Sequence, residues 1–183
     1  MRIQANPINQ YPWYLRFMFR GQNKKYGQVL FSGLLWARVP KLFIAISLVF
    51  GFLNRKKSPI SPTLRALICV RISQINLCSS CIDLNSALLA EREGSMEKVE
   101  ALDNWQDNDV FSDQERAVLE YAEAITFSDR QVTDELFDKL RTYFDEEAII
   151  ELTGLIGYQH MSNIFNISLQ IPTQGLCPVN LKN

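Results

Sequence analysis

The stretch LRALICVRISQINLCSSCIDLN, residues 64–85, decides the fold. Its first part repeats aliphatic residues at helical spacing, which predicts a helix over about residues 63–74. Asn76 and Leu77 interrupt this pattern. A second helix is expected to begin at Cys78 and to run to about residue 92. The stretch therefore predicts two consecutive helices, with a Cys-x-x-Cys pair at the start of the second.

Helical patterns continue on both sides of this stretch, and no segment of any length shows the alternation of a strand. Ser112 to Glu115 reads as a capping box that opens an amphipathic helix. The expected class is all-α, with an N-terminal helical region over residues 1–58 and a main domain over residues 59–183. The other expected helices span residues 13–19, 25–39 (after a break at Gly21), 41–53, 96–102, a helix opened by Thr133, and 146–168, followed by an extended tail over 172–183.

Composition excludes several function classes. The chain has 183 residues, of which 47% are hydrophobic, and a net charge of −1. Nucleic-acid binding is not expected, because a basic patch is missing. No metal or other cofactor is expected, because a structural zinc site needs about four ligands and His160 is the one histidine beside four cysteines. The N-terminus shows no signal peptide pattern, so a cytoplasmic location is expected.

The apolar segment from Leu42 to Leu53 raises the question of a membrane anchor. It has about a dozen residues, whereas a spanning helix needs roughly 20. Basic residues flank it on both sides. The segment is therefore predicted to be a helix buried in the core or in an interface between subunits, and a dimer or larger oligomer is expected.

The Cys78/Cys81 pair points to thiol redox chemistry. The N-terminus of a helix carries partial positive charge, which stabilises a thiolate. Two cysteines at this spacing can cycle between dithiol and disulfide. Asn85 lies four residues after Cys81 on the same helix face, but its amide does not titrate. On position alone Cys78, nearest to the helix start, is the favoured nucleophile.

Residues 64–85, 111–126, 149–153 and 163–166 resemble the carboxymuconolactone decarboxylase family, in its AhpD-like (alkylhydroperoxidase D-like) branch. The resemblance covers about residues 60–172. It implies an all-helical fold that oligomerises through its helices. It also implies reduction of hydroperoxides by the cysteine pair, with an external thiol as reductant.

The same resemblance implies a proton relay of a glutamate and a histidine to the cysteines, with the second cysteine as its target. The matching positions here hold Ala66 and Asn85. Loss of a general base typically costs about 10²–10⁴-fold in rate. The resemblance therefore favours Cys81 as nucleophile where position favours Cys78, and the choice stays open at this point.

Two other side chains are candidates to support the cysteines. His160 could replace the missing base, or could be a hydrogen-bonded structural histidine. Arg71 could lower the pKa of a thiol by its charge, or could pair with Glu115 or Glu151. Of the remaining cysteines, Cys69 is expected to be buried and inert and Cys177 to be free and exposed.

Three functions remain. The first is a thiol-dependent antioxidant enzyme, an alkylhydroperoxidase-like peroxidase or thiol–disulfide oxidoreductase acting through Cys78 and Cys81. The second is a weakly active or non-catalytic redox-sensing oligomer, which the residues Ala66 and Asn85 support. The third is a lactone decarboxylase, and the cysteine pair argues against it because that reaction does not need one.

Overall fold

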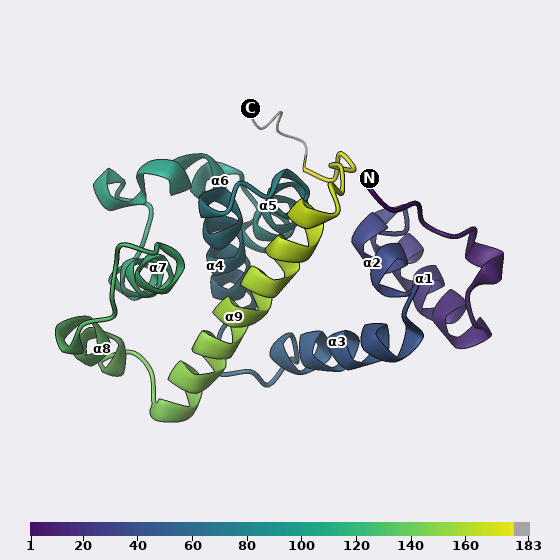
Figure 1. Cartoon of the computed structure of the whole chain (residues 1–183). Coiled ribbons are helices and arrows are strands. Elements are labelled where there is room, and N and C mark those ends of the chain that lie inside the picture. The colour runs from purple at the N-terminus through teal and green to yellow at the C-terminus, as the bar shows by residue number, and fades with distance from the viewer. Residues whose placement is uncertain (178–183) are drawn as a thin grey trace.

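Helices form the fold throughout residues 1–177, the part of the chain that the computed structural model describes, and no strand occurs among them (Figure 1). This confirms the predicted all-α class. The expected tail over residues 172–183 is described only as far as Cys177. In chain order the helices are η1 (Ile8–Gln10), α1 (Trp13–Tyr26), α2 (Phe31–Trp36), α3 (Pro40–Leu53), α4 (Pro62–Ile75), α5 (Ser79–Glu93), α6 (Glu97–Ala101), η2 (Leu102–Asp107), α7 (Asp113–Thr126), α8 (Asp134–Arg141) and α9 (Glu146–Ser168).

Helix α4 lies at the centre of the main hydrophobic core. Ser61 caps it, because its Oγ accepts a hydrogen bond from the backbone N–H of Leu64 at 3.1 Å, and Pro62 occupies the first turn. Aliphatic and small residues follow on almost every face of the helix. As a result α4 packs against α5, α7 and α9 at once, and it fixes the place where the chain turns into α5.

The break between α4 and α5 is a short turn that places the cysteines. Leu77 adopts a left-handed conformation with φ of 55°. The backbone N–H of Cys78 then donates to the carbonyl oxygen of Ser73 at 2.9 Å. The carbonyl oxygen of Cys78 in turn accepts from the N–H groups of Cys81 and Ile82, both at 2.9 Å. Cys78 is thereby the N-cap of α5, as the sequence predicted.

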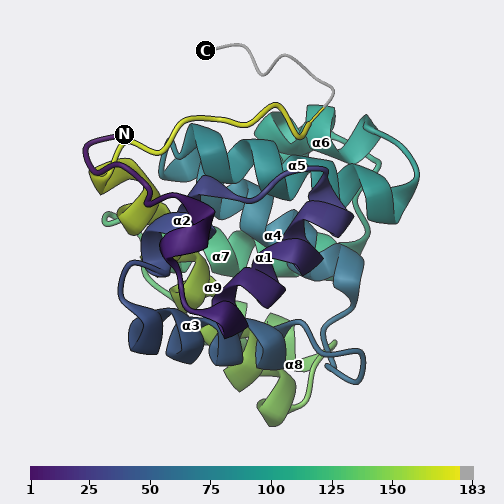
Figure 2. The ribbon, with the colours of Figure 1, turned by 90° about the vertical axis from the view of Figure 1, so that its right-hand side faces the viewer.

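Helices α1 to α3 form a separate layer on one side of the remaining helices (Figures 1 and 2). They have a small hydrophobic cluster of their own, built on Tyr11, Leu15, Phe19, Leu34 and Phe43. The predicted break at Gly21 is wrong, since α1 continues through that residue and ends at Gly27, where φ is 72°. This layer faces α5 and α9, and so it covers the side of the core that carries the cysteines.

The apolar helix α3 is not buried within a single chain. Phe43 and Leu53 are its buried residues, whereas Leu48 is 69% exposed and Phe52 is 59% exposed. Of the two predicted settings for this segment, the core of the chain is therefore wrong. No helix in residues 1–177 is both long enough and apolar enough to cross a membrane.

The segment after α9 returns along α5 and ties the layers together. The carboxylate of Asp83 accepts hydrogen bonds from the backbone N–H groups of Gln174 at 2.9 Å and Cys177 at 2.8 Å. The side chain of Gln174 bonds across to Gln28 and to the N–H of Phe31. Cys177 is free but buried, so its predicted exposure is wrong: the bonds to Asp83 hold it against the protein.

Candidate active site

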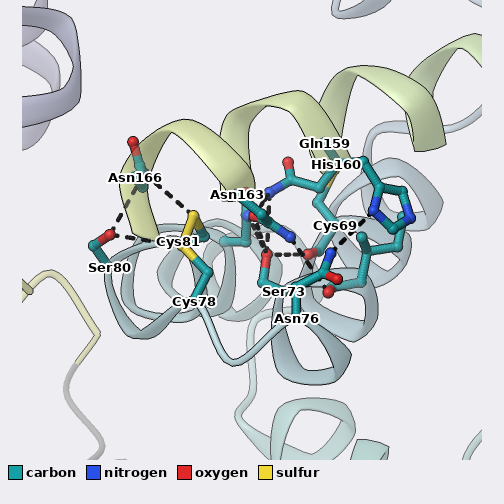
Figure 3. The surroundings of a disulfide bond; sticks show 12 residues. Cys69, Ser73, Asn76, Cys78, Ser80, Cys81, Gln159, His160, Asn163 and Asn166 are labelled. Atoms are coloured by element: carbon teal, nitrogen blue, oxygen red, sulfur yellow. Dashed lines mark hydrogen bonds between the residues drawn. A yellow bond between two sulfur atoms is a disulfide. The ribbon is translucent and has the colours of Figure 1, made fainter. Parts of the chain in front are cut away.

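Cys78 and Cys81 are joined as a disulfide at the start of α5, with their Cα atoms 5.3 Å apart (Figure 3). Both are buried, with 1% of Cys78 and 4% of Cys81 exposed. The bond is possible because the turn at Leu77 brings Cys78 to the N-cap, one turn of helix before Cys81. Both sulfurs therefore lie where the free N–H groups of α5 create positive potential, which favours a thiolate when the bond is reduced.

Asn166 holds the sulfur of Cys81 from the facing helix α9. Its Nδ2 donates to Cys81 Sγ at 3.2 Å and lies 3.4 Å from Ser80 Oγ. Cys78 Sγ, by contrast, has a 3.8 Å contact with Ser80 Oγ. An amide N–H that points at a sulfur stabilises negative charge there. Asn166 was missed as a site residue because it lies 85 positions after Cys81.

Next to the disulfide lies a buried cluster of uncharged polar side chains centred on Ser73 (Figure 3). The Oγ of Ser73 accepts from Asn85 Nδ2 at 3.3 Å and from Gln159 Nε2 at 3.1 Å. Asn163 Oδ1 accepts from Gln159 Nε2 at 2.8 Å. Among the described residues, the hydrogen bonds of this cluster involve no titratable side chain. The candidate residue Asn85 is thus tied to Ser73, one turn of α5 away from Cys81.

His160 does not reach the sulfurs. Its Nδ1 lies 3.1 Å from Asn76 Nδ2, and its Nε2 lies 3.0 Å from Thr126 Oγ1. In Figure 3 the Ser73 cluster lies between this ring and the disulfide. Burial lowers the pKa of His160. The contacts match the structural alternative for this histidine, in which it links α9 to α7 and to the turn before α5.

Arg71 on α4 belongs to a buried ion cluster with Glu123 of α7. It pairs with Glu123, N to O 2.6 Å, and Glu123 also accepts from Trp105 Nε1 at 2.7 Å. The predicted partners are wrong, because Glu115 pairs with Lys98 and Glu151 pairs with Arg55. Burial by itself would raise the pKa of Glu123, but the hydrogen bonds from Trp105, Arg71 and Arg130 lower it.

Cys69 lies on α4 in the main hydrophobic core. Burial raises the pKa of its thiol to about 12, so the neutral thiol persists at neutral pH. Because the thiolate is the reactive form of cysteine, this residue is inert, as the sequence predicted. It gives a buried cysteine of the same chain against which the reactivity of the Cys78/Cys81 pair can be compared.

A cavity of about 420 Å³ opens beside Cys81, and we call it the Cys81 cavity. Helices α1, α2 and α3 form one wall and helices α5 and α9 form the other. Cys81 and Asn85 line it from α5, and Gln159 and Asn166 line it from α9. Most of the remaining wall is apolar. Cys78 is not among the lining residues, so Cys81 is the cysteine of the pair that borders the cavity.

Comparison with known proteins identifies the chain. Residues 40–124 match the family model described as "Carboxymuconolactone decarboxylase family". The uncharacterised Escherichia coli protein YnjA is 42% identical over 94% of this chain and 95% of its own length. The chain belongs to the carboxymuconolactone decarboxylase family. The Bacillus subtilis protein YdfG, also uncharacterised, is 33% identical over 62% of this chain and 78% of its own length.

Solved structures place this family member in the AhpD-like fold. The apo form of the debrominase Bmp8 matches with a TM-score of 0.83 and 26% identity, over 94% of this chain and 91% of that one. An uncharacterised peroxidase-related protein from Ralstonia eutropha, described as an alkylhydroperoxidase AhpD core, matches with a TM-score of 0.86 and 21% identity, over 96% of this chain and 95% of that one. The second likeness concerns the fold alone.

The two positions that the family resemblance assigned to a proton relay are both buried here. Ala66 lies in α4 and Asn85 lies in α5, each less than a tenth exposed. Neither side chain titrates, so neither can accept a proton from a cysteine. In this member of the carboxymuconolactone decarboxylase family, Asn166 donates a hydrogen bond to the sulfur of Cys81, and the N-terminus of α5 adds positive potential. Among the described residues, no titratable side chain forms a hydrogen bond with that sulfur.

Proposed function

We propose that the chain is a thiol-dependent oxidoreductase that reduces hydroperoxides through Cys78 and Cys81. The observation that carries the proposal is the position of Cys81, which is half of a disulfide-forming pair and also a wall residue of the Cys81 cavity. Cys81 borders the cavity, whereas Cys78 is not among its lining residues. This arrangement favours Cys81 as the attacking thiolate and Cys78 as the resolving thiol.

The reaction has three steps. The Cys81 thiolate attacks one oxygen of the hydroperoxide, the O–O bond breaks, and the alkoxide leaves as the alcohol after it takes up a proton. Cys81 is then a sulfenic acid. The thiol of Cys78 attacks its sulfur, the S–O bond breaks, and water leaves as the disulfide forms. An external dithiol then reduces the disulfide by exchange and is itself oxidised.

Stabilisation of the thiolate takes the place of a general base. The N-terminus of α5 and the amide of Asn166 both favour negative charge on Cys81. Asn85 and Ala66 supply no proton acceptor. Since general bases contribute about 10²–10⁴-fold, the expected activity is slower than that of a protein with a complete relay, and it increases with pH as the thiol ionises.

The test is the rate of cumene hydroperoxide consumption with dithiothreitol as reductant. Cys78→Ser and Cys81→Ser should each abolish turnover, and Cys81→Ser should also abolish the first oxidation step. Cys69→Ser is the matched control, because that thiol is buried in the same domain and lies outside the pair. Turnover that persists in Cys81→Ser would refute the proposed role of the pair.

The second candidate is the weakly active, redox-sensing oligomer, which Ala66 and Asn85 favour. It predicts that the disulfide forms and is reduced reversibly while peroxide consumption stays at the background rate. A titration of free thiols before and after one equivalent of peroxide, compared with steady-state turnover, separates the two. Oxidation of the pair without turnover would select the sensor.

The likeness to the debrominase Bmp8 suggests a third reaction for the same pair. A cysteine variant of that protein has been solved in complex with 2,3,4-tribromopyrrole, with a TM-score of 0.84 to this chain. Dithiol-driven debromination releases bromide, replaces it by hydrogen and leaves a disulfide. Release of bromide from tribromopyrrole at a rate above that of cumene hydroperoxide reduction would favour this reaction over the peroxidase.

Self-association and a cytoplasmic location complete the proposal. The exposed apolar side chains of α3, Leu48 and Phe52 among them, would be covered by a second copy of the chain. The reducing cytoplasm would supply the thiols that regenerate the pair. A monodisperse monomer in light scattering at micromolar concentration would refute the oligomer.

A further inference from the structure

The size of the Cys81 cavity is the first indication of what it binds. A water molecule has a share of about 30 Å³ in the liquid, and hydrogen peroxide, with one more oxygen atom, is only modestly larger. The cavity measures about 420 Å³. Sites of about 300–1,000 Å³ take drug-sized organic molecules. Hydrogen peroxide would leave most of this space to water, so the cavity fits a much larger molecule.

The walls are the second indication. Met18, Phe43 and Phe50 contribute apolar surface from the α1–α3 layer, and Leu84 and Leu88 contribute it from α5. Two aromatic contacts join the layers around the cavity: Trp36 stacks on Phe165 with centroids 3.6 Å apart, and Phe50 contacts Tyr158 at 6.0 Å. A molecule with an apolar body would gain free energy by entering this space.

Charge is the third indication. Lys25, near the end of α1, is the one charged residue among the lining residues of the cavity, and its ammonium lies 4.9 Å from the ring centre of Tyr26. Tyr158 on the other wall stays neutral at physiological pH, because burial raises its pKa to about 12. Lys25 is exposed at the edge of the cavity, and no carboxylate lies among the lining residues, so an acidic group of a ligand would meet a cation there without a competing anion.

We propose that the Cys81 cavity binds an organic acid with an apolar body, whose acidic group pairs with Lys25 and whose other end reaches Cys81. Lys25 belongs to α1 and Cys81 to α5, so the two polar ends of the ligand would be held by different layers. As a statement about the substrate, this rests on the proposed function. As a statement about binding, it concerns the oxidised protein and needs no turnover.

The probes are 4-phenylbutyrate and its neutral counterpart 4-phenylbutan-1-ol, titrated calorimetrically into the full chain in its disulfide form. The acid should bind about two- to fivefold more tightly than the alcohol, the size of effect expected for one exposed charge pair. Lys25→Gln should remove this preference. Lys24→Gln is the matched control, since it is the neighbouring lysine of α1 and does not line the cavity.

A second pair of variants tests the space itself. Gly21 lines the cavity on α1, and a Cβ added there meets no atom within 4 Å, so Gly21→Leu can start its side chain without a clash and should occupy part of the cavity. It should weaken binding of both probes by about tenfold or more. Gly51→Leu, on α3 and outside the lining, is the control, because its Cβ also meets nothing within 4 Å.

The position of the ligand is tested in the reduced protein. Saturating 4-phenylbutyrate should slow alkylation of Cys81 by iodoacetamide severalfold, measured by mass spectrometry of the cysteine peptides. Absence of binding, equal effects of Lys24→Gln and Lys25→Gln, no effect of Gly21→Leu, or an unprotected Cys81 would each overturn the inference. Binding with protection but no peroxide turnover would refute the proposed function alone.

Discussion

Asn85→His tests whether the missing base limits the chemistry of the pair. Asn85 lies one turn after Cys81 on α5, lines the Cys81 cavity, and donates to Ser73 Oγ at 3.3 Å. A larger imidazole has room because the cavity adjoins it. The substitution weakens one buried hydrogen bond, worth about 1 kcal/mol of stability. It adds a group that can take a proton from Cys81.

General bases contribute about 10²–10⁴-fold, and we expect the lower end, about 10²-fold, because Ala66 gives the new histidine no acidic partner. The assay is the rate constant for oxidation of the reduced protein by cumene hydroperoxide between pH 5 and 9. In Asn85→His the rate constant should rise with pH, with a midpoint near the ordinary histidine pKa of about 6.5. Asn85→Gln is the neutral control, and identical rates and pH profiles for the two variants would refute the reasoning.

Two further predictions concern stability. Glu123→Gln should lower the free energy of unfolding in urea by about 3 kcal/mol, because Arg71 loses its buried carboxylate; a loss below about 1 kcal/mol would contradict the role of this ion pair. Because the pKa of Glu123 is lower in the folded protein than the pKa of about 4.3 in the unfolded chain, Glu123 stabilises the fold at pH values above 4.3. This stabilisation is lost as the pH falls through the folded-state pKa, so Glu123→Gln should lose less stability in acid than the unsubstituted protein. The pKa of His160 is also lowered, here by burial, so the folded protein binds that proton less readily than the unfolded chain and loses stability as pH falls below about 6.5. His160→Gln should flatten the dependence of the melting temperature on pH between 6.5 and 5, and an unchanged slope would show that another group causes it.

Local signals in the sequence predicted several helix ends, although the helix expected over residues 25–39 is wrong, since α1 runs to Tyr26 and a separate helix α2 begins at Phe31. Ser61 accepts from Leu64 at the start of α4, and Ser112 forms the complete capping box with Glu115 at the start of α7. Gly94, with φ of 73°, ends α5. Each of these signals acts within one turn of helix, so the residues that make the bond are neighbours in the sequence and tertiary structure does not change the outcome.

Predictions failed where distant packing outweighed a local preference. Glycine costs a helix about 1 kcal/mol, yet α1 continues through Gly21 because Leu15 and Phe19, earlier on the same helix, are buried in the N-terminal cluster and hold it in place. The segment around Trp105 lies after the expected helix over residues 96–102 and was not predicted to be helical. It forms the short helix η2 instead, with the indole buried and its Nε1 bonded to Glu123 on α7.

The candidate site divides in the same way. The Cys78/Cys81 pair could be predicted because both the helix start and the spacing are local. The contact of Asn166 with Cys81 could not, and neither could the cavity, since its walls come from α1, α2, α3, α5 and α9. A usable signal was present in α9, where Gln159, Asn163 and Asn166 place three amides on one buried helix face. Buried amides need partners, and such a row indicates a polar site.

The uncharged surroundings of Cys81 connect the chemistry to the cavity. A site with a proton relay can activate its thiol for any small oxidant that enters. Here Asn166 and the start of α5 stabilise the thiolate but do not move a proton. Selectivity then depends on how long and how well a substrate is held against the sulfur, because positioning alone contributes strongly to rate. The α1–α3 layer, which builds the other wall of the cavity, would therefore determine the substrate as much as the cysteines determine the reaction.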